Sequence, residues 1–226
     1  FDLDGVITPT ADVHQRAWSS MFNAFLGSRG LDQDYTLDDY HRYVDGKPRY
    51  EGVRSFLDSR DIDLDEGDPS DDSSAETVCG LGNRKNDEFE RILDEEGVEA
   101  YPGSVALVDA LLERGTKMAI VSSSRNAPKV LEAAGMIQHF PVIVDGAVAA
   151  SRHLAGKPAP DTFLDAAVQL DVPRERAVVF EDALSGVRAG RAGRFGLVVG
   201  VDRGAGVDAL TEHGADVVVS DLQELL

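Results

Sequence analysis

Two carboxylates near the start of the chain are the residues best placed to do chemistry. Asp2 and Asp4 stand in the run Phe1-Asp2-Leu3-Asp4-Gly5. Residues two apart on a strand face the same side, and a glycine permits a sharp turn where the strand ends. We therefore expect both carboxylates to converge on one small volume above a sheet. Two carboxylates at that distance repel each other, and a hard cation such as Mg²⁺ relieves the repulsion.

The chemistry open to this pair is phosphoryl transfer. One aspartate can attack phosphorus to form an aspartyl-phosphate, and the other can carry the proton of a leaving or entering hydroxyl. The alternative is an ordinary acidic turn, because Asp-x-Asp-Gly alone is a common pattern. Residues later in the chain decide between the two interpretations.

The elements that would position this pair follow Tyr101-Pro102-Gly103, where strand and helix patterns alternate. We expect strands at 117–121, 140–144, 177–180, 196–201 and 216–219. The helices before and between them are expected at 105–114, 127–134, 161–170, 185–192 and 207–213. Uniformly apolar strands separated by helices predict a parallel sheet covered on both faces. The expected fold class is α/β, a doubly wound, Rossmann-like parallel sheet.

Residues 12–96 have a different pattern, with helical spacing and no convincing strand. Helices are expected at 11–26, 37–44 and 50–60, and residues 80–87 lead into a further helix. Residues 61–76 are acidic and rich in serine, which is typical of a solvated loop or local disorder. We therefore expect a core domain made of 1–11 and 97–226, with a small helical cap domain inserted at 12–96.

Composition limits the classes of partner. The chain has 226 residues, a formal net charge of −19 and no long basic run, which disfavours nucleic acid and anionic membrane surfaces. A small anionic substrate remains compatible, because a few local cations can dominate one cleft. The single Cys79 excludes an internal disulfide and fits a reducing compartment, and no apolar run could span a bilayer. We expect a cytoplasmic monomer. The first strand is short, so residues upstream of Phe1 are also expected, and a targeting segment there stays open.

Polar side chains follow two further strands and mark the same edge of the sheet. In parallel sheets the ligand binds beyond the carboxyl ends of the strands. Residues 122–126 follow one strand, Glu181-Asp182 follow another, and Lys157 precedes the helix at 161–170. The serines could simply end a strand and Lys157 could sit in a surface turn. The occurrence of all these groups in this order favours a site.

Each of these groups has a role in phosphoryl transfer. Asp182, with Asp2 and the backbone carbonyl of Asp4, can hold Mg²⁺, and Glu181 can assist directly or through water. Ser122 can donate a hydrogen bond to a phosphoryl oxygen. Lys157 can neutralise the incoming phosphate and offset the carboxylate charge.

The chain resembles the haloacid dehalogenase superfamily of phosphotransferases, on Asp2-x-Asp4, Ser122, Lys157 and Glu181-Asp182 in that order. The resemblance covers essentially the whole chain, and residues 12–96 are similar to that family's helical cap. Within the superfamily it is closest to the beta-phosphoglucomutase subgroup. The residues that carry this closer likeness are 2–8, His14, Trp18, Gly46, Arg49, 84–87, 122–126 and 157–161.

The resemblance implies specific roles. Asp2 would be the nucleophile and Asp4 the general acid and base, while Ser122 and Lys157 would bind the transferring phosphate. The second phosphate would be bound by Arg49, Ser124, Arg125 and Asn126. His14, as a catalytic residue, and Lys85 would help place the sugar and Asp4. Trp18, Gly46 and Ser123 would also bind the substrate. The metal would be Mg²⁺, with Asp2, Asp4, Glu181 and Asp182 around it.

The chain departs from that pattern in two places. Pro9 stands where mutases of this group often carry an acidic residue, and proline stiffens the hinge before the cap. The acidic loop 61–76 is longer than a compact cap needs, so it could alter the sugar pocket.

The leading functional prediction is a mutase that interconverts beta-D-glucose 1-phosphate and glucose 6-phosphate. A phosphatase acting on a small sugar phosphate, with water as acceptor, is the alternative within the same chemistry. A non-enzymatic protein that keeps the fold is a third possibility, which the intact Asp2, Asp4, Lys157 and Asp182 disfavour.

Overall fold

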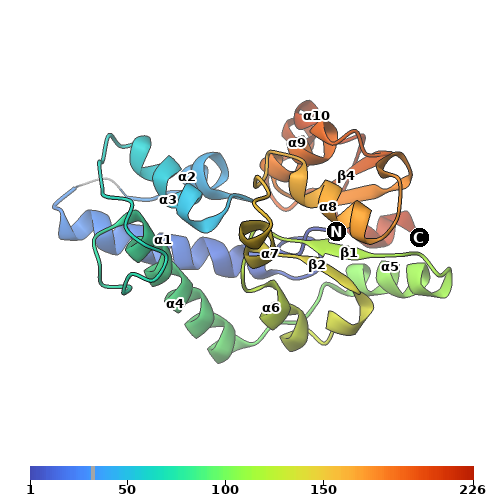
Figure 1. Ribbon diagram of the computed structural model, residues 1–226, viewed down its shortest axis with the longest axis horizontal. Helices are drawn as coiled ribbons and strands as arrows, with labels where there is room; N and C mark the ends of the chain where they lie inside the picture. The colour runs from blue at the N-terminus through green and yellow to red at the C-terminus, as the bar shows by residue number, and fades with distance from the viewer. Residues whose placement is uncertain (32–33) are drawn as a thin grey trace. The chain divides into compact units, whose positions relative to one another are not determined.

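The computed structural model describes residues 1–31 and 34–226, which form two compact units (Figure 1). The first unit comprises Phe1–Thr10, Gly46–Pro48 and Val98–Leu226, and the second comprises Ala11–Asp45 and Arg49–Gly97. These limits fall one residue from the predicted ends of the core. The segment Gly46–Pro48, inside the predicted cap range, groups with the first unit instead.

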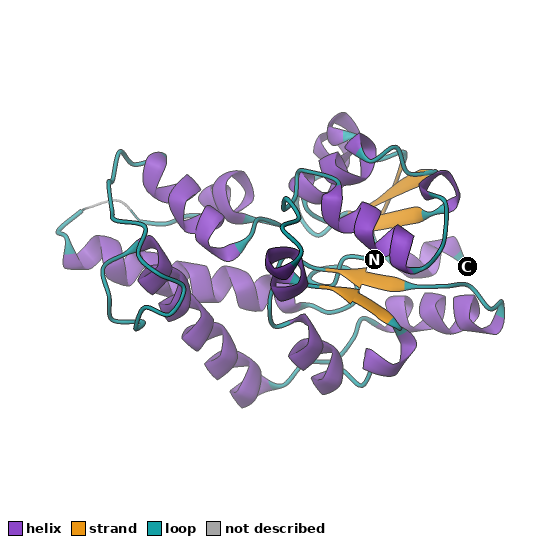
Figure 2. Cartoon of the chain, viewed as in Figure 1, coloured by secondary structure: helices purple, strands orange, loops and turns teal. Residues whose placement is uncertain are grey.

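In the described part of the chain, the strands all lie in the first unit (orange in Figure 2). They are β1 (Ala119–Val121), β2 (Val142–Val144), β3 (Val178–Glu181), β4 (Leu197–Val201) and β5 (Val217–Val219). Its α-helices are α5 (Pro102–Glu113), α6 (Ala127–Ala133), α7 (Gly146–Ser151), α8 (Asp161–Gln169), α9 (Leu184–Ala192) and α10 (Val207–His213). The 3₁₀ turns are η2 (Ile137–His139), η3 (Arg174–Arg176) and η4 (Leu222–Leu225).

Every pairing between these strands is parallel. β1 pairs with β2, and β4 pairs with both β3 and β5. The helices α9 and α10 pack on β3, β4 and β5, while α8 packs on β1 and β2. Almost all residues of β1 and β4 are buried, as expected for a sheet covered by helices. The predicted α/β fold with a parallel sheet is confirmed.

The expected first strand joins the two groups of strands. Phe1 N donates to Ala119 O at 2.9 Å and Val121 N donates to Phe1 O at 2.8 Å. On the other side, Asp2 N donates to Phe180 O at 2.9 Å. The extended residues Phe1–Leu3 therefore lie between β1 and β3. This position brings Asp2 to the carboxyl end of both neighbouring strands.

The second unit contains helices and loops only, among the residues described. Its elements are α1 (Thr10–Ser28, whose first residue belongs to the first unit), α2 (Leu37–Asp39), the π-helix η1 (Tyr40–Val44), α3 (Arg49–Asp58) and α4 (Val78–Glu96). The predicted apolar stripe of the first helix is buried at Val13, Ala17, Met21 and Phe25.

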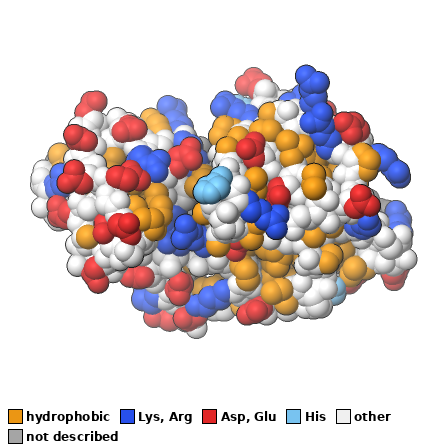
Figure 3. All heavy atoms as spheres, viewed as in Figure 1, with side chains coloured by type: hydrophobic (Ala, Val, Ile, Leu, Met, Phe, Trp, Pro, Cys, Tyr) orange, Lys and Arg blue, Asp and Glu red, His pale blue; other side chains and the backbone are white. Residues whose placement is uncertain are grey.

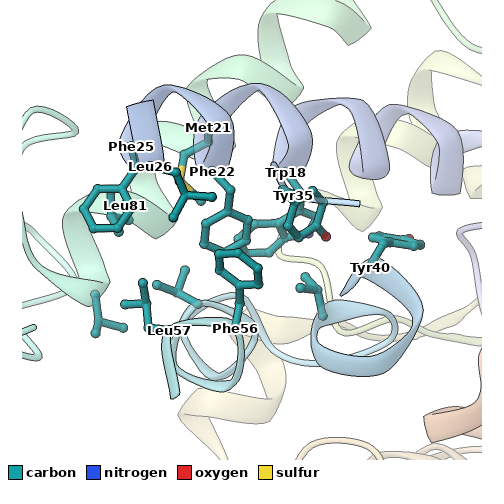
Figure 4. Close-up of a cluster of buried hydrophobic side chains, with 13 residues drawn as sticks. Trp18, Met21, Phe22, Phe25, Leu26, Tyr35, Tyr40, Phe56, Leu57 and Leu81 are labelled. Atoms are coloured by element: carbon teal, nitrogen blue, oxygen red, sulfur yellow. The ribbon is translucent and has the colours of Figure 1, made fainter. Parts of the chain in front are cut away.

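Aromatic rings form the core of this unit (Figure 4). The Phe22 ring centroid lies 4.1 Å from that of Phe56, 5.0 Å from that of Tyr35 and 5.3 Å from that of Trp18. Phe22 and Phe56 are completely buried. Tilted and offset aromatic pairs of this kind add to the stabilisation that burial alone supplies. The unit therefore has its own hydrophobic core.

The acidic stretch 61–76 is a loop, as expected, and side chains fix its course. Thr77 Oγ1 donates to Asp71 Oδ2 at 2.6 Å. Arg84 Nε donates to the carbonyl of Ser73 at 2.7 Å, and Asn83 Nδ2 donates to the carbonyl of Asp71 at 2.8 Å. The loop is thereby held against the first turns of α4.

Two sequence-based expectations need correction. Residues 80–87 belong to α4 itself, which begins after Thr77 caps it by accepting from Gly80 N at 2.9 Å. Gly80 and Gly82 are there for close packing, since a Cβ on Gly82 would lie 2.7 Å from the Tyr50 ring. Helix α7 was not predicted, although Asp145 caps it through Ala147 N and Val148 N.

Carboxylate side chains are spread over the face of the molecule shown in Figure 3, in keeping with the net charge of −19. Across the described parts of the chain, no helix combines the length and the apolar character that crossing a bilayer would need.

Candidate active site

A buried lysine stands at the centre of the candidate site. Lys157 Nζ donates to Asp2 Oδ1 at 2.5 Å, to Glu181 Oε1 at 2.5 Å and to the carbonyl of Val121 at 3.1 Å. Only 2% of the lysine is exposed. Burial alone would lower the pKa of Lys157, but the charges of Asp2 and Glu181 outweigh it and raise the pKa. The ammonium is therefore charged at neutral pH and bridges the two carboxylates.

Asp2 is buried in the strand-end position that the sequence predicts. Burial raises the pKa of the Asp2 carboxyl, and the charges of Glu181 and Asp4 add to the rise, while Lys157 opposes it. A carboxylate in such surroundings has exchanged its water shell for one fixed ammonium partner. This arrangement suits a nucleophile, because little solvent has to be removed before the carboxylate reaches phosphorus.

Three carboxylates converge beside Lys157. One oxygen from each of Asp2, Glu181 and Asp182 lies within 4.8 Å of the others. Both oxygens of Glu181 accept protein hydrogen bonds, since Oε2 accepts from Ala183 N at 2.9 Å and Oε1 from Lys157. Carboxylate oxygens gathered around one point are suitable ligands for a hard divalent cation. Asp2 and Asp182 are the side chains of this group best placed to be direct ligands.

Gly5 leaves room for Asp182. Its φ is +81°, a conformation that favours glycine, and a Cβ at this position would collide with the Asp182 carboxylate. The sequence predicted the turn at Gly5 but not this close approach. The glycine thus lets the loop after Asp4 and the end of β3 meet.

Hydroxyl groups hold the second aspartate. Thr10 Oγ1 donates to Asp4 Oδ1 at 2.5 Å, and Ser122 Oγ donates to Asp4 Oδ2 at 3.2 Å. The hydroxyls of Thr8 and Thr10 are 2.7 Å apart and share a further hydrogen bond. Both threonines are completely buried. The two oxygens of Asp4 are therefore oriented from opposite sides.

The turn after β1 is braced by its own serines. Ser122 Oγ accepts from Ser124 N at 3.0 Å, and Ser124 Oγ accepts from Asn126 N at 3.1 Å. Ser123 Oγ donates to the carbonyl of Gly46 at 2.7 Å. Ser122 is thus brought to Asp4, and the predicted residues 123–126 follow it in one tight turn. The backbone of Arg125 also lies close to Gly146 at the start of α7.

The predicted substrate-binding residues of the second unit form two clusters. Lys85 Nζ contacts His14 Nδ1 and lies 5.0 Å from the Trp18 ring centroid, and the His14 ring stacks on Phe89 at 4.1 Å. Arg49 belongs to the other cluster, described below. That these residues act on the same substrate as Asp2 stays a prediction.

Two residues of the site went unrecognised in the sequence. Thr10 is a hydroxyl residue close behind Asp4, which was a usable signal. Arg203 Nε donates to the carbonyl of Gly5 at 2.9 Å from beyond the end of β4, and its guanidinium covers the Tyr101 ring at 3.9 Å. An arginine just after the predicted strand 196–201 was the available sign.

The fold and these charged groups are suited to phosphoryl transfer at the carboxyl ends of a parallel sheet. Residues 1–194 match the family model of the haloacid dehalogenase-like hydrolases. The chain therefore belongs to this family, and it is an enzyme.

The relatives are consistent with that assignment. The chain is 50% identical to a beta-phosphoglucomutase of Mycobacterium bovis, covering 100% of this chain and 90% of that protein. It is 34% identical to the beta-phosphoglucomutase of Bacillus subtilis, over 99% and 92% of the two chains. Among solved structures, a beta-phosphoglucomutase of Clostridium difficile superposes with a TM-score of 0.78 at 26% identity, over 100% and 91% of the two chains.

Proposed function

We propose that this enzyme is a Mg²⁺-dependent sugar-phosphate mutase that interconverts beta-D-glucose 1-phosphate and glucose 6-phosphate. The observation that carries the proposal is the buried contact of Lys157 with Asp2, beside Asp182. It occurs in a chain that is 50% identical to a beta-phosphoglucomutase over its full length. We also propose that the enzyme acts in the cytoplasm.

In the first half-reaction, a carboxylate oxygen of Asp2 bonds to phosphorus of a glucose bisphosphate. The bond from phosphorus to the sugar oxygen breaks, and Asp4 gives its proton to that oxygen. Thr10 and Ser122 hold Asp4 ready for this transfer. The products are the Asp2 phosphoenzyme and a glucose monophosphate.

In the second half-reaction, a hydroxyl of the monophosphate attacks the phosphorus on Asp2. Asp4 takes the hydroxyl proton, and the carboxylate of Asp2 leaves. Lys157 stabilises the phosphoryl oxygens in both directions, with Ser122 as a hydrogen-bond donor. A bound Mg²⁺, held by Asp2, Asp182 and the Asp4 carbonyl, would supply charge neutralisation for the phosphoryl group.

A mutase needs a second anion site, because the sugar keeps one phosphate while the other is transferred. We propose Arg49, Ser124, Arg125 and Asn126 for this site, since guanidinium groups grip phosphate oxygens in a bidentate manner. His14, Trp18, Gly46, Lys85 and Ser123 would place the sugar.

The test is ³¹P NMR of the enzyme with beta-glucose 1-phosphate, Mg²⁺ and a trace of the bisphosphate. We expect the glucose 1-phosphate signal to be replaced by that of glucose 6-phosphate. Release of inorganic phosphate alone would overturn the mutase proposal.

That outcome would support the second candidate, a phosphatase on a small sugar phosphate. The matched family is described as one of hydrolases, which supports a phosphatase as the second candidate. The same Asp2 phosphoenzyme would form, and water would replace the sugar hydroxyl as acceptor.

A further inference from the structure

Two asparagines of α4 hold the guanidinium of Arg49 at the start of α3. Arg49 Nη2 donates to Asn86 Oδ1 at 2.5 Å, and Arg49 Nη1 donates to Asn83 Oδ1 at 3.4 Å. The two asparagines are three residues apart on one helix, so they face the same side. Both terminal nitrogens of the guanidinium are thereby engaged by a single surface.

The amide of Asn86 is itself oriented. Its Nδ2 donates to Glu90 Oε1 at 2.6 Å, one turn further along α4. A carboxylate accepts and cannot donate, so this contact turns the NH₂ group toward Glu90 and the carbonyl oxygen toward Arg49. Glu90 thus acts on Arg49 through Asn86.

Asn83 connects the same arginine to the loop 61–76. Its Nδ2 donates to the carbonyls of Pro69 at 3.2 Å and Asp71 at 2.8 Å, which turns its Oδ1 toward Arg49 and toward Tyr50 Oη at 2.9 Å. The course of the acidic loop therefore fixes the orientation of one acceptor of Arg49.

The chemistry of these acceptors suits an anion-binding arginine. An amide oxygen orients a guanidinium without cancelling its charge, whereas a carboxylate does both. A guanidinium with a fixed plane loses less freedom when it binds phosphate, so holding it in advance improves affinity.

We propose that Asn86 is a positioning residue for the second-phosphate site: it presets the plane of the Arg49 guanidinium, with Glu90 and Asn83 in support. This inference rests on the proposed function, in which Arg49 binds the phosphate that is not being transferred. It also gives the acidic loop a part in setting affinity for the sugar phosphate.

The test compares wild type, Asn86→Ala, Arg49→Ala and the double variant, with KM and kcat for beta-glucose 1-phosphate. We expect Asn86→Ala to raise KM about tenfold, the size expected for a hydrogen bond to a charged group, while kcat changes much less. In the Arg49→Ala background the same substitution should add almost nothing to KM. p-Nitrophenyl phosphate, which has no second phosphate, should show a far smaller change.

A matched control separates positioning from general support of the fold. Asn23 in α1 also uses both ends of its amide, accepting from Tyr35 N at 2.8 Å and donating to Ser19 Oγ at 3.1 Å. Asn23→Ala should lower the Tm and leave KM for the sugar phosphate unchanged. Glu90→Gln, which keeps the side-chain shape, should raise KM less than Asn86→Ala.

A readout independent of turnover keeps the two proposals apart. ¹⁵N NMR of the arginine side chains reports rotation of the Arg49 guanidinium, which should be slow in wild type and faster in Asn86→Ala. If rotation changes while KM does not, Asn86 positions Arg49 and the second-phosphate role of Arg49 is wrong. Equal KM effects of Asn86→Ala with and without Arg49, or unchanged rotation, would overturn the inference itself.

Discussion

At the scale of single residues, the buried ammonium of Lys157 depends on its carboxylate partners. Its ammonium is removed from water and is compensated by Asp2 and Glu181. Removing one partner of a buried ion pair is strongly destabilising, because an uncompensated charge remains. Lys157 has two partners, so the loss of Asp2 leaves it paired with Glu181. We therefore expect that Asp2, the proposed nucleophile, can be substituted with the fold intact.

We expect Asp2→Ala to abolish turnover, because no neighbouring group can replace an attacking carboxylate at this position. The measurement is conversion of beta-glucose 1-phosphate, with circular dichroism to show that the variant folds. Activity well above background hydrolysis in a folded variant would contradict the assignment of Asp2 as nucleophile.

Thr10 should influence proton transfer through Asp4. Thr10→Val keeps the volume and removes the hydroxyl that donates to Asp4 Oδ1. A hydrogen bond to a charged group is worth roughly 1.5–3 kcal/mol, so we expect kcat to fall about tenfold or more. An unchanged kcat in a folded Thr10→Val variant would make Thr10 a purely structural residue.

The sequence was sufficient to predict residues whose chemical type and strand-end position coincide. Asp2, Ser122 and Asp182 each follow a strand, so parallel topology alone places them at one edge. Thr10 could not be assigned from its position, because its hydrogen bond depends on how the turn after Asp4 folds back. Such a turn has no periodic pattern that would reveal it.

At the scale of elements, α2 depends on one buried carboxylate. Asp39 Oδ2 accepts from Thr36 N at 2.9 Å in a capping box, and Asp39 Oδ1 accepts from Arg60 Nη2 at 2.8 Å. Burial alone would raise the pKa of Asp39, but the hydrogen bonds from Thr36 and the charge of Arg60 outweigh it and lower the pKa. The charged form of Asp39 therefore stabilises the folded state.

This shift has a defined pH dependence. A carboxyl with a lowered pKa in the folded state contributes stability above its ordinary value of 3.8, and the contribution is lost as pH falls below it. We expect Asp39→Asn to lower the free energy of unfolding at pH 7 by about 1–3 kcal/mol. The difference from wild type should shrink as the pH falls through about 4.

Denaturant unfolding at several pH values measures this difference. The matched control is Asp38→Asn, because Asp38 pairs with Arg42 on the exposed surface. Exposed pairs contribute little, so this variant should remain near wild type throughout. If the loss of unfolding free energy in Asp39→Asn did not depend on pH, the shape of the side chain, and not its charge, would stabilise the protein.

Sequence patterns located most elements but did not distinguish glycines in turns from glycines packed inside a helix. Gly46 does mark a turn, whereas Gly80 and Gly82 lie inside α4, where small size permits contact with Ala75 and Tyr50. A glycine used for packing looks the same in a sequence as one used for a turn. Single-sequence reasoning therefore placed the start of α4 too late.

At the scale of the whole molecule, the negative charge of the candidate site predicts a requirement for a cation. Asp2, Glu181 and Asp182 face one ammonium, so the centre carries a formal charge of −2 when all are ionised. A phosphate dianion should be repelled unless a divalent cation is bound. We expect enzyme treated with EDTA to lose activity and to recover it with Mg²⁺.

The recovery can be tied to the proposed ligands. Asp182→Asn should raise the Mg²⁺ concentration needed for half-maximal activity, with little change in the Tm of the metal-free protein. Full turnover by EDTA-treated wild type without added metal would rule out a metal requirement.

The division of the chain also bears on how the protein is made. The second unit is complete once Gly97 has been synthesised, whereas the first unit needs Phe1 and Asp2 to pair with β1 and β3, more than 100 residues later. A ribosome adds about 5–20 residues per second. The helical unit therefore has several seconds to fold before Phe1–Leu3 can pair with both β1 and β3. During that interval the two aspartates at the start of the chain lie in an unpaired apolar segment open to chaperones. The catalytic centre is therefore expected to be among the last parts of the nascent protein to form.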